Sequence, residues 1–354
     1  MCSKIDIMNK VILSLLAIIL MISACKNDPK GAQQMPPEAT DPARSGEAYS
    51  MTLDGKKLME WNEPAEIKAK NDAAISNTRT RYLQGLNDVT RYLEYAKSYL
   101  ADGHVENAIS ILDKAAAKFE NTADVFYWRG EAKIKGRQFA EANSDFWKAA
   151  KLMETQQGYK GLVRLTGIDS ILNPSLHYLN YQGMGMSYQA AGELNSADKM
   201  YEVCGDFSTN PDLWTVSYYY QYQNYARSGN ETGAKEVMAT VDKSKQTLPP
   251  FKPYLDALLY WKGDIAEDDL VDLDQMPHSS EEARPWLIKA YALVVKAMIE
   301  KKNDKALEYC NKILSCGYWA QYPYILAESD ALRIRKIQIP KTDVIDIRGT
   351  SKPN

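Results

Sequence analysis

A pair of alanines that recurs at a fixed interval is the strongest constraint on how this 354-residue chain can fold. Ala108 and Ala115 return as Ala142 and Ala149, each after 34 residues, in stretches with helical apolar spacing. A constant interval of this length is typical of stacked supersecondary units, each of which buries its apolar face against its neighbours. The sequence therefore predicts a repeat array built from pairs of helices.

The positions that are apolar or small within one unit identify the kind of repeat. Counted from the start of a unit they are positions 4, 7, 8, 11, 20, 24 and 27, and the best match, which starts at residue 178, has Tyr181, Met184, Gly185, Tyr188, Ala197, Tyr201 and Cys204. Small residues let the two helices of a hairpin approach closely, and large ones fill the space between hairpins. This pattern resembles the tetratricopeptide-repeat (TPR) family. The resemblance implies an all-α, right-handed superhelix of helix-turn-helix units.

The resemblance covers roughly residues 85–335 and divides the chain into segments. We expect a signal peptide at 1–24, a flexible tether at 25–48, a helical lead-in at 49–88, a repeat domain at 89–336 with units near 89–122, 123–156, 178–211, 212–245 and 285–318, and a polar tail at 337–354. Extra helices are expected between the repeats, and a capping helix near 322–335. In one such insertion, Asp264 with Glu267 three residues later predicts a helix capping box.

Turns between the two helices of a unit carry glycine where a positive φ is needed. These turns are Asp102-Gly103, Gly136-Arg137, Gly192-Glu193 and Gly229-Asn230. Their common register supports the division into units.

The N-terminus has the features of a bacterial lipoprotein signal. Lys4 and Lys10 precede an apolar run at 11–24 that is too short to span a membrane as a helix. "ISAC" at 22–25 resembles the lipobox, whose cysteine, here Cys25, carries a diacylglycerol. Met8 is an alternative start, and an ordinary secretory signal or short anchor is the alternative to lipidation. The following residues resemble lipoproteins from Bacteroidota, which implies the outer membrane and leaves its periplasmic face or the cell surface open.

Composition and motifs favour neither nucleic-acid binding nor catalysis. The net charge of −3 and pI near 5.8 leave no basic surplus for phosphates. His104, His177 and His278 lack ligand spacing and are expected at the surface or in turns, so no metal is predicted. "GMGMS" at 183–187 matches neither the G-x-G-x-x-G phosphate loop nor the G-x-S-x-G nucleophile turn, and Gly185 falls on a small-residue packing position. We therefore predict a non-enzymatic protein with no cofactor and no catalytic residue.

Three features keep alternatives open. The acidic run Asp264, Glu267, Asp268, Asp269, Asp272 and Asp274 lacks the central glycine of a calcium loop, which favours a solvated helix face, with a docking patch for a basic partner as the alternative. Cys204 and Cys310 are expected to be core thiols, and Cys310 can pair with Cys316 only if a helix ends between them. The tripeptide at 169–171, "DSI", matches an O-glycosylation site of Bacteroidota.

The concave groove of a TPR array is lined by positions 2, 5, 9, 12 and 13 of each first helix. The partner-binding candidates at these positions are Lys97, Tyr127, Glu131, Gln182, Met186, Tyr219, Gln223 and Arg227. The Lys and Asn that clamp a C-terminal carboxylate in chaperone-binding members are absent. A mixed groove of this kind suits an extended or helical peptide.

The Tyr-rich stretch "WTVSYYYQYQNYA" at 214–226 is interpreted mainly as packing. Trp214, Tyr218, Tyr222 and Tyr225 form one helical stripe and are expected in the core. Tyr220 is expected to face a neighbouring helix or solvent. Tyr219 is expected in the groove, with Tyr127 as its companion.

The order of the parts is similar to NlpI-type lipoproteins, including a "YWKGDIAEDDL" segment before the last hairpin. That similarity implies a scaffold for an envelope assembly, with protein partners in the groove and the membrane held through Cys25. A glycan-binding lipoprotein similar to the SusD type is the alternative, because such proteins also combine TPR hairpins with aromatic residues.

Overall fold

The computed structural model describes residues 49–156, 158–162, 169–244 and 247–336. Their regular structure is helical except for a two-stranded antiparallel hairpin of β1 (Ser50–Met51) and β2 (Lys57–Leu58). The predicted all-α TPR fold class is thus confirmed. The signal peptide, Cys25, the tether and the polar tail lie outside the described residues. No helix of the described part is long and apolar enough to cross a membrane.

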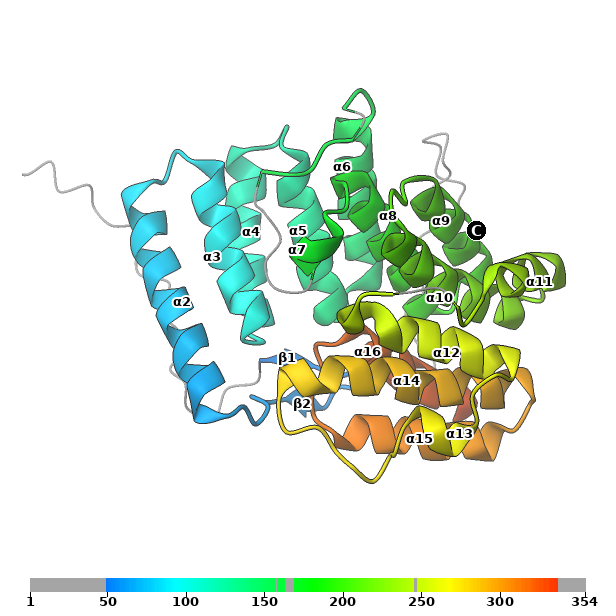
Figure 1. Cartoon of the computed structure of the whole chain (residues 1–354). Coiled ribbons are helices and arrows are strands. Elements are labelled where there is room, and N and C mark those ends of the chain that lie inside the picture. Colours follow the sequence, from blue (N-terminus) through cyan, green and yellow to red (C-terminus); the bar gives the residue numbers. More distant parts are fainter. Residues whose placement is uncertain (1–48, 157, 163–168, 245–246, 337–354) are drawn as a thin grey trace, which may run out of the picture. The chain divides into compact units, whose positions relative to one another are not determined.

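Successive helix pairs form the array (Figure 1). The first helices are α3 (Val89–Ala101), α5 (Ala123–Lys135), α8 (Leu176–Ala191), α10 (Pro211–Ser228) and α14 (Ser280–Ile299). Their partners are α4 (Val105–Lys118), α6 (Phe139–Met153), α9 (Leu194–Asp206), α11 (Glu231–Thr240) and α15 (Asn303–Ser315). The second helix of one hairpin packs on the first helix of the next, as α4 does on α5, α6 on α8, and α9 on α10.

Small residues allow this close stacking. The recurring alanines Ala108, Ala115, Ala142 and Ala149 are all fully buried. At Gly185 of α8 an added Cβ would lie 2.4 Å from the ring of Tyr201 on α9. That distance is closer than real Cβ contacts, so α8 and α9 depend on glycine here. The packing interpretation of "GMGMS" is confirmed.

The turns follow the prediction in three of the four hairpins considered. Gly103, Gly192 and Gly229 have φ between 82° and 87°. In the second turn the expectation was wrong, because Gly136 has φ −82° and the positive φ of 61° belongs to Arg137. A non-glycine residue seldom adopts this conformation, but the exposed Lys301 has it too, with φ 59° in the turn between α14 and α15.

The lead-in contains more than a helix. Helix α2 (Ala65–Gln84) packs on α3, but β1, β2 and an extended segment precede it. Two side chains from the loop that follows α15 hold that segment. Trp319 Nε1 donates a hydrogen bond to the carbonyl of Met59 at 2.8 Å, and Tyr318 OH donates one to the carbonyl of Asn62 at 2.9 Å. The start and the end of the described chain therefore meet.

The insertions contribute short elements. They are α7 (Asp169–Leu172), the 3-10 turn η1 (Pro249–Phe251), α12 (Lys252–Lys262) and α13 (Glu267–Leu270). The first insertion is anchored by Asp124 of α5, whose buried carboxylate accepts hydrogen bonds from Tyr159 OH at 2.8 Å and Leu162 N–H at 2.6 Å. Burial raises the pKa of Asp124 despite these donors. The side chains of the first two residues of the "DSI" tripeptide lie outside the described residues.

The predicted capping box at Asp264 is wrong. The residue before α13 is Ala266, which makes no side-chain cap bond. Glu267 turns instead to α15, where it pairs with Lys305 at 3.0 Å and accepts a short hydrogen bond from Tyr309. Asp274 likewise pairs with Lys312 at 2.6 Å. Two members of the acidic run therefore connect α13 and its loop to α15.

The histidines are less exposed than expected. His278 is exposed, whereas His104 is buried in the turn before α4. The surface interpretation of His177 is wrong, because this residue is buried in α8 with its ring 4.9 Å from that of Phe207. Within the described ranges, no group of three or more His, Cys, Asp or Glu side chains could hold a metal ion.

The cysteines of the described part are free thiols. Cys204 and Cys310 are buried, as expected for core positions, and Cys316 is half-buried just after the end of α15. Burial raises the pKa of Cys316 to about 11 and that of the other two further. Thiols of this kind are chemically inert at neutral pH.

Candidate functional site

The last hairpin does not simply extend the array. Helix α14 packs on α10 and α12, and the capping helix α16 (Tyr322–Ile334) packs on α8 and α14. Helix α16 is also connected to the second hairpin through Arg137, which donates to Glu328 Oε2 at 2.7 Å. The C-terminal helices therefore lie against the first helices of earlier hairpins, where an open groove was expected.

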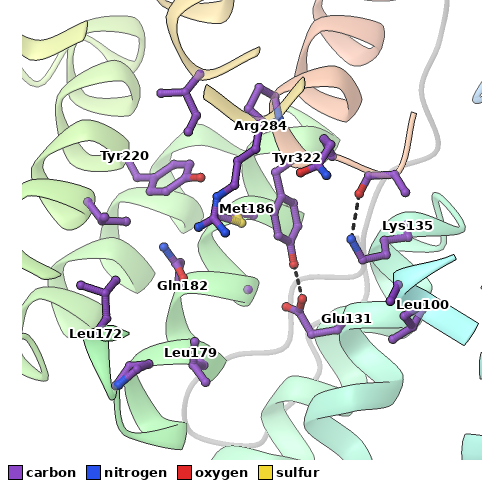
Figure 2. A pocket seen from close by; sticks show the side chains of 18 of the residues that line it. Leu100, Glu131, Lys135, Leu172, Leu179, Gln182, Met186, Tyr220, Arg284 and Tyr322 are labelled. Atoms are coloured by element: carbon purple, nitrogen blue, oxygen red, sulfur yellow. Dashed lines mark hydrogen bonds between the residues drawn. The ribbon is translucent and has the colours of Figure 1, made fainter. Parts of the chain in front are cut away.

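A cavity of about 620 Å³ remains between these two sets of helices (Figure 2). One wall comes from the first helices α3, α5, α8 and α10, and the other from α12, α14 and the start of α16. Aromatic and aliphatic residues dominate the lining. They include Trp61, Leu100, Tyr127, Trp128, Tyr178, Leu179, Met186, Val216, Tyr220, Tyr254, Ile288 and Tyr322.

Polar bonds across the cavity connect its two walls. Tyr322 OH donates to Glu131 Oε2 at 2.5 Å, and Lys135 Nζ donates to the carbonyl of Ala320 at 2.8 Å (Figure 2). Burial, and then the charge of Glu131, raise the pKa of Tyr322 well above its ordinary value. The phenol therefore stays a neutral donor. On the α3 side, Lys97 Nζ lies 4.7 Å from the ring centroid of Trp128, which is a cation–π distance.

Arg284 extends from the second turn of α14 into the cavity (Figure 2). Its side chain points toward Gln182 and Met186 of α8, with Tyr220 and Tyr322 on either side in this view. The site thus combines a large apolar surface with a few charged and amide groups from both walls. Such a lining is typical of pockets that bind organic ligands.

Five of the predicted partner-binding residues line this cavity. They are Lys97, Tyr127, Glu131, Gln182 and Met186. All five belong to the first helices of the first three hairpins. Their placement follows from the repeat register, which directs these positions to the inner face of the array.

The other three candidates, Tyr219, Gln223 and Arg227, are buried instead of facing a groove. Tyr219 OH donates to the carbonyl of Ile288 at 3.1 Å, and Gln223 accepts from Gln189 at 3.0 Å. Arg227 pairs with Asp330 at 2.6 Å. The expectation was wrong because α14 and α16 cover the inner face of α10.

The burial of the inner face of α10 also changes which rings of the Tyr-rich helix lie in the core. Tyr219 and Tyr220 are 0% and 3% exposed, whereas Trp214 is 37% exposed. Of the predicted core stripe only Tyr225 is buried, while Tyr218 and Tyr222 are half-buried. The Tyr219 ring packs at 5.3 Å on Trp261 of α12. The face of α10 that carries Tyr219 is therefore buried against α12 and α14.

Sequence reasoning missed the wall that faces the repeats, including Trp61, Tyr254, Arg284 and Tyr322. One signal was present: α14 contains "WLIKAYALVVKAM", which is apolar nearly all round and is buried along most of its length. A helix of this kind belongs in an interior and not at the open end of an array. Nothing local identified which surface it would cover.

The chain has distant similarity to solved structures. No protein-family model matches the chain, and no curated protein matches it. The crystal structure of MamA is 18% identical over 56% of this chain and 95% of that chain, with a TM-score of 0.38. YrrB, described as "a TPR protein with an unusual peptide-binding site", is 16% identical over 75% of this chain and 100% of that chain, with a TM-score of 0.37. These values are too low to indicate what this chain binds.

Proposed function

We propose that the chain is a non-catalytic scaffold that docks segments of protein partners in the cavity between the repeats and the C-terminal helices. The observation that carries this proposal is the cavity itself, which is about 620 Å³ in volume and is lined by apolar residues with a few charged ones. TPR hairpins present such inner surfaces to extended or helical peptides. Because α12, α14 and α16 form the second wall, a partner segment would be held from two sides.

The N-terminal sequence supports a location for this activity. The basic residues, short apolar run and "ISAC" at 22–25 favour lipidation at Cys25 and anchoring in the outer membrane of a bacterium, with the tether between anchor and fold. Together with the NlpI-type order of segments, this favours partners in an envelope assembly, such as secretion components or peptidoglycan enzymes. The membrane face is left open.

Replacing Leu179 by Arg tests the docking proposal. Leu179 is half-buried in the cavity wall, so a long cation there fills apolar space and is expected to release the partners that crosslink to the wild-type protein. The measurement is a crosslinked pull-down from membranes with quantitative mass spectrometry. Leu248→Arg is the matched control, because Leu248 is 45% exposed and lies outside the cavity lining.

Retention of every wild-type partner by Leu179→Arg would contradict docking in the cavity. Capture of no protein, combined with tryptophan fluorescence changes on adding polysaccharide, would instead favour the SusD-type alternative.

Replacing Cys25 by Ser tests the anchor. We expect the protein to move from the membrane to the soluble fraction, because the acyl chains that hold it are lost. Mass spectrometry of the mature N-terminus would show diacylglycerol on the wild type and none on the variant. Ser23→Ala leaves the cysteine in place and serves as the control. An unmodified Cys25 in the membrane-bound wild type would contradict lipid anchoring.

A further inference from the structure

The cavity carries more positive than negative side chains, in contrast to the chain as a whole. Lys97, Lys135 and Arg284 line it with two carboxylates, Glu131 and Glu281, whereas the net charge of the chain is −3. One of these carboxylates, Glu131, accepts a hydrogen bond from Tyr322, and the other, Glu281, is exposed. Local charge of one sign selects ligands of the other sign and repels like charges. The charge balance therefore favours an occupant with an anionic group.

Arg284 has the geometry to receive that group. Its side chain crosses the cavity from α14 toward α8 (Figure 2). Its charge acts on Tyr220, where it opposes the rise that burial gives to the pKa of this phenol. A guanidinium has five N–H donors in a planar fork, so it can hold a carboxylate at two points and keep bonds within the protein. A lysine would offer only a point charge.

The chain itself places an aromatic ring in the lining of this cavity and a carboxylate against Ser280, another lining residue. Trp61, which lines the cavity, belongs to a segment without regular secondary structure. Two residues later, Glu63 accepts hydrogen bonds from the backbone N–H of Ser280 at 3.2 Å and from Trp61 Nε1 at 2.9 Å. Ser280 lies one helical turn before Arg284 on α14. A segment with one aromatic and one acidic residue thus already packs against the start of α14.

We propose that the cavity binds an extended segment of a partner protein in which an acidic side chain, held by Arg284, is flanked by apolar or aromatic residues. The apolar neighbours would lie on the aliphatic lining from α8, including Leu179 and Met186. This inference rests on the proposed function and specifies its ligand. It differs from capture of a C-terminal carboxylate, because the ligand group is a side chain and the cation comes from the last hairpin, on the wall opposite the first helices of the earlier hairpins.

Selection of peptides from a random heptapeptide phage library tests the proposal. The baits are the immobilised full-length protein and its variants Arg284→Gln, Arg284→Lys and Arg335→Gln. We expect the wild type to enrich peptides with Asp or Glu beside apolar residues, and Arg284→Gln to lose the acidic preference. Synthetic versions of the enriched peptides should bind Arg284→Gln about 10- to 100-fold more weakly, as expected for a charge-assisted hydrogen bond. The affinity of Arg284→Lys for these peptides should lie between those of the wild type and Arg284→Gln.

Two controls separate this effect from misfolding. Arg335 is exposed on the surface outside the cavity lining, so Arg335→Gln should keep wild-type selectivity. On the wild-type protein, changing the acidic residue of an enriched peptide to its amide should weaken binding about as much as Arg284→Gln does. Enriched peptides without acidic preference, or a preference that survives in Arg284→Gln, would overturn this inference while leaving peptide docking intact. A wild-type bait that enriches no peptide would overturn the proposed function as well.

Discussion

Replacing Asp330 by Ala is expected to lower the free energy of unfolding by about 3–5 kcal/mol, as for other buried ion pairs that lose one partner. The Asp330 carboxylate is fully buried where α10, α14 and α16 meet. It pairs with Arg227 at 2.6 Å, accepts from Tyr291 OH at 2.7 Å, and forms a short bond with Arg333. Without it, Arg227 loses its counterion at a site where its side chain is only 6% exposed, so water cannot readily replace the carboxylate.

Urea unfolding followed by circular dichroism measures this effect. The control is Glu231→Ala, whose pair with Lys235 has both side chains about 80% exposed and is expected to change stability by less than about 1 kcal/mol. Asp330→Asn keeps the shape of the side chain but not its charge, so it should lower the free energy of unfolding less than Asp330→Ala does. An Asp330→Ala variant as stable as Glu231→Ala would show that the buried network does not hold the C-terminal helices in place.

Replacing Glu328 by Ala is expected to lower the free energy of unfolding by a similar amount, about 3–5 kcal/mol. The change should also loosen both ends of the described chain. Glu328 accepts from the Leu53 backbone N–H at 2.6 Å and pairs with Arg137 at 2.7 Å, where both side chains are less than a tenth exposed. The change leaves a buried cation and an unpaired N–H. Hydrogen exchange should accelerate in β1, in α16 and in the turn between α5 and α6.

The double variant Arg137→Met with Glu328→Met provides the matched comparison. Removing both charges avoids the unpaired cation, so the double variant should be more stable than Glu328→Ala. If it were equally or more destabilised, lost packing and not electrostatics would explain the effect. Unchanged hydrogen exchange in β1 would contradict the connection between Leu53 and Glu328.

Much of the fold was predictable because repeat packing is local. The alanines that recur after 34 residues are fully buried, and Gly185 lies against Tyr201 only one hairpin turn away in sequence. Each such contact joins residues within a unit or between adjacent units, so the periodic pattern contains the information for it. The same local register placed Lys97, Glu131 and Met186 on the inner face, where they line the cavity.

The remainder of the site depends on distant residues. Tyr219 has the same register as Tyr127, yet it is closed off by α14, whose Ile288 lies 69 residues further along the chain. The Arg137 guanidinium likewise pairs with Glu328, 191 residues away. No periodicity within one unit encodes contacts of this kind.

The sequence by itself determined that the chain forms TPR-like hairpins, where most of them lie, and which positions of the first three face inward. These properties follow from the sizes of side chains at fixed spacings, because small residues permit and large residues fill the contacts between adjacent helices. Only the tertiary structure decided that the last hairpin and α16 fold against the inner face and turn an open groove into a two-walled cavity. That outcome is set by long-range apolar burial and by buried pairs such as Arg227 with Asp330, whose partners are 103 residues apart.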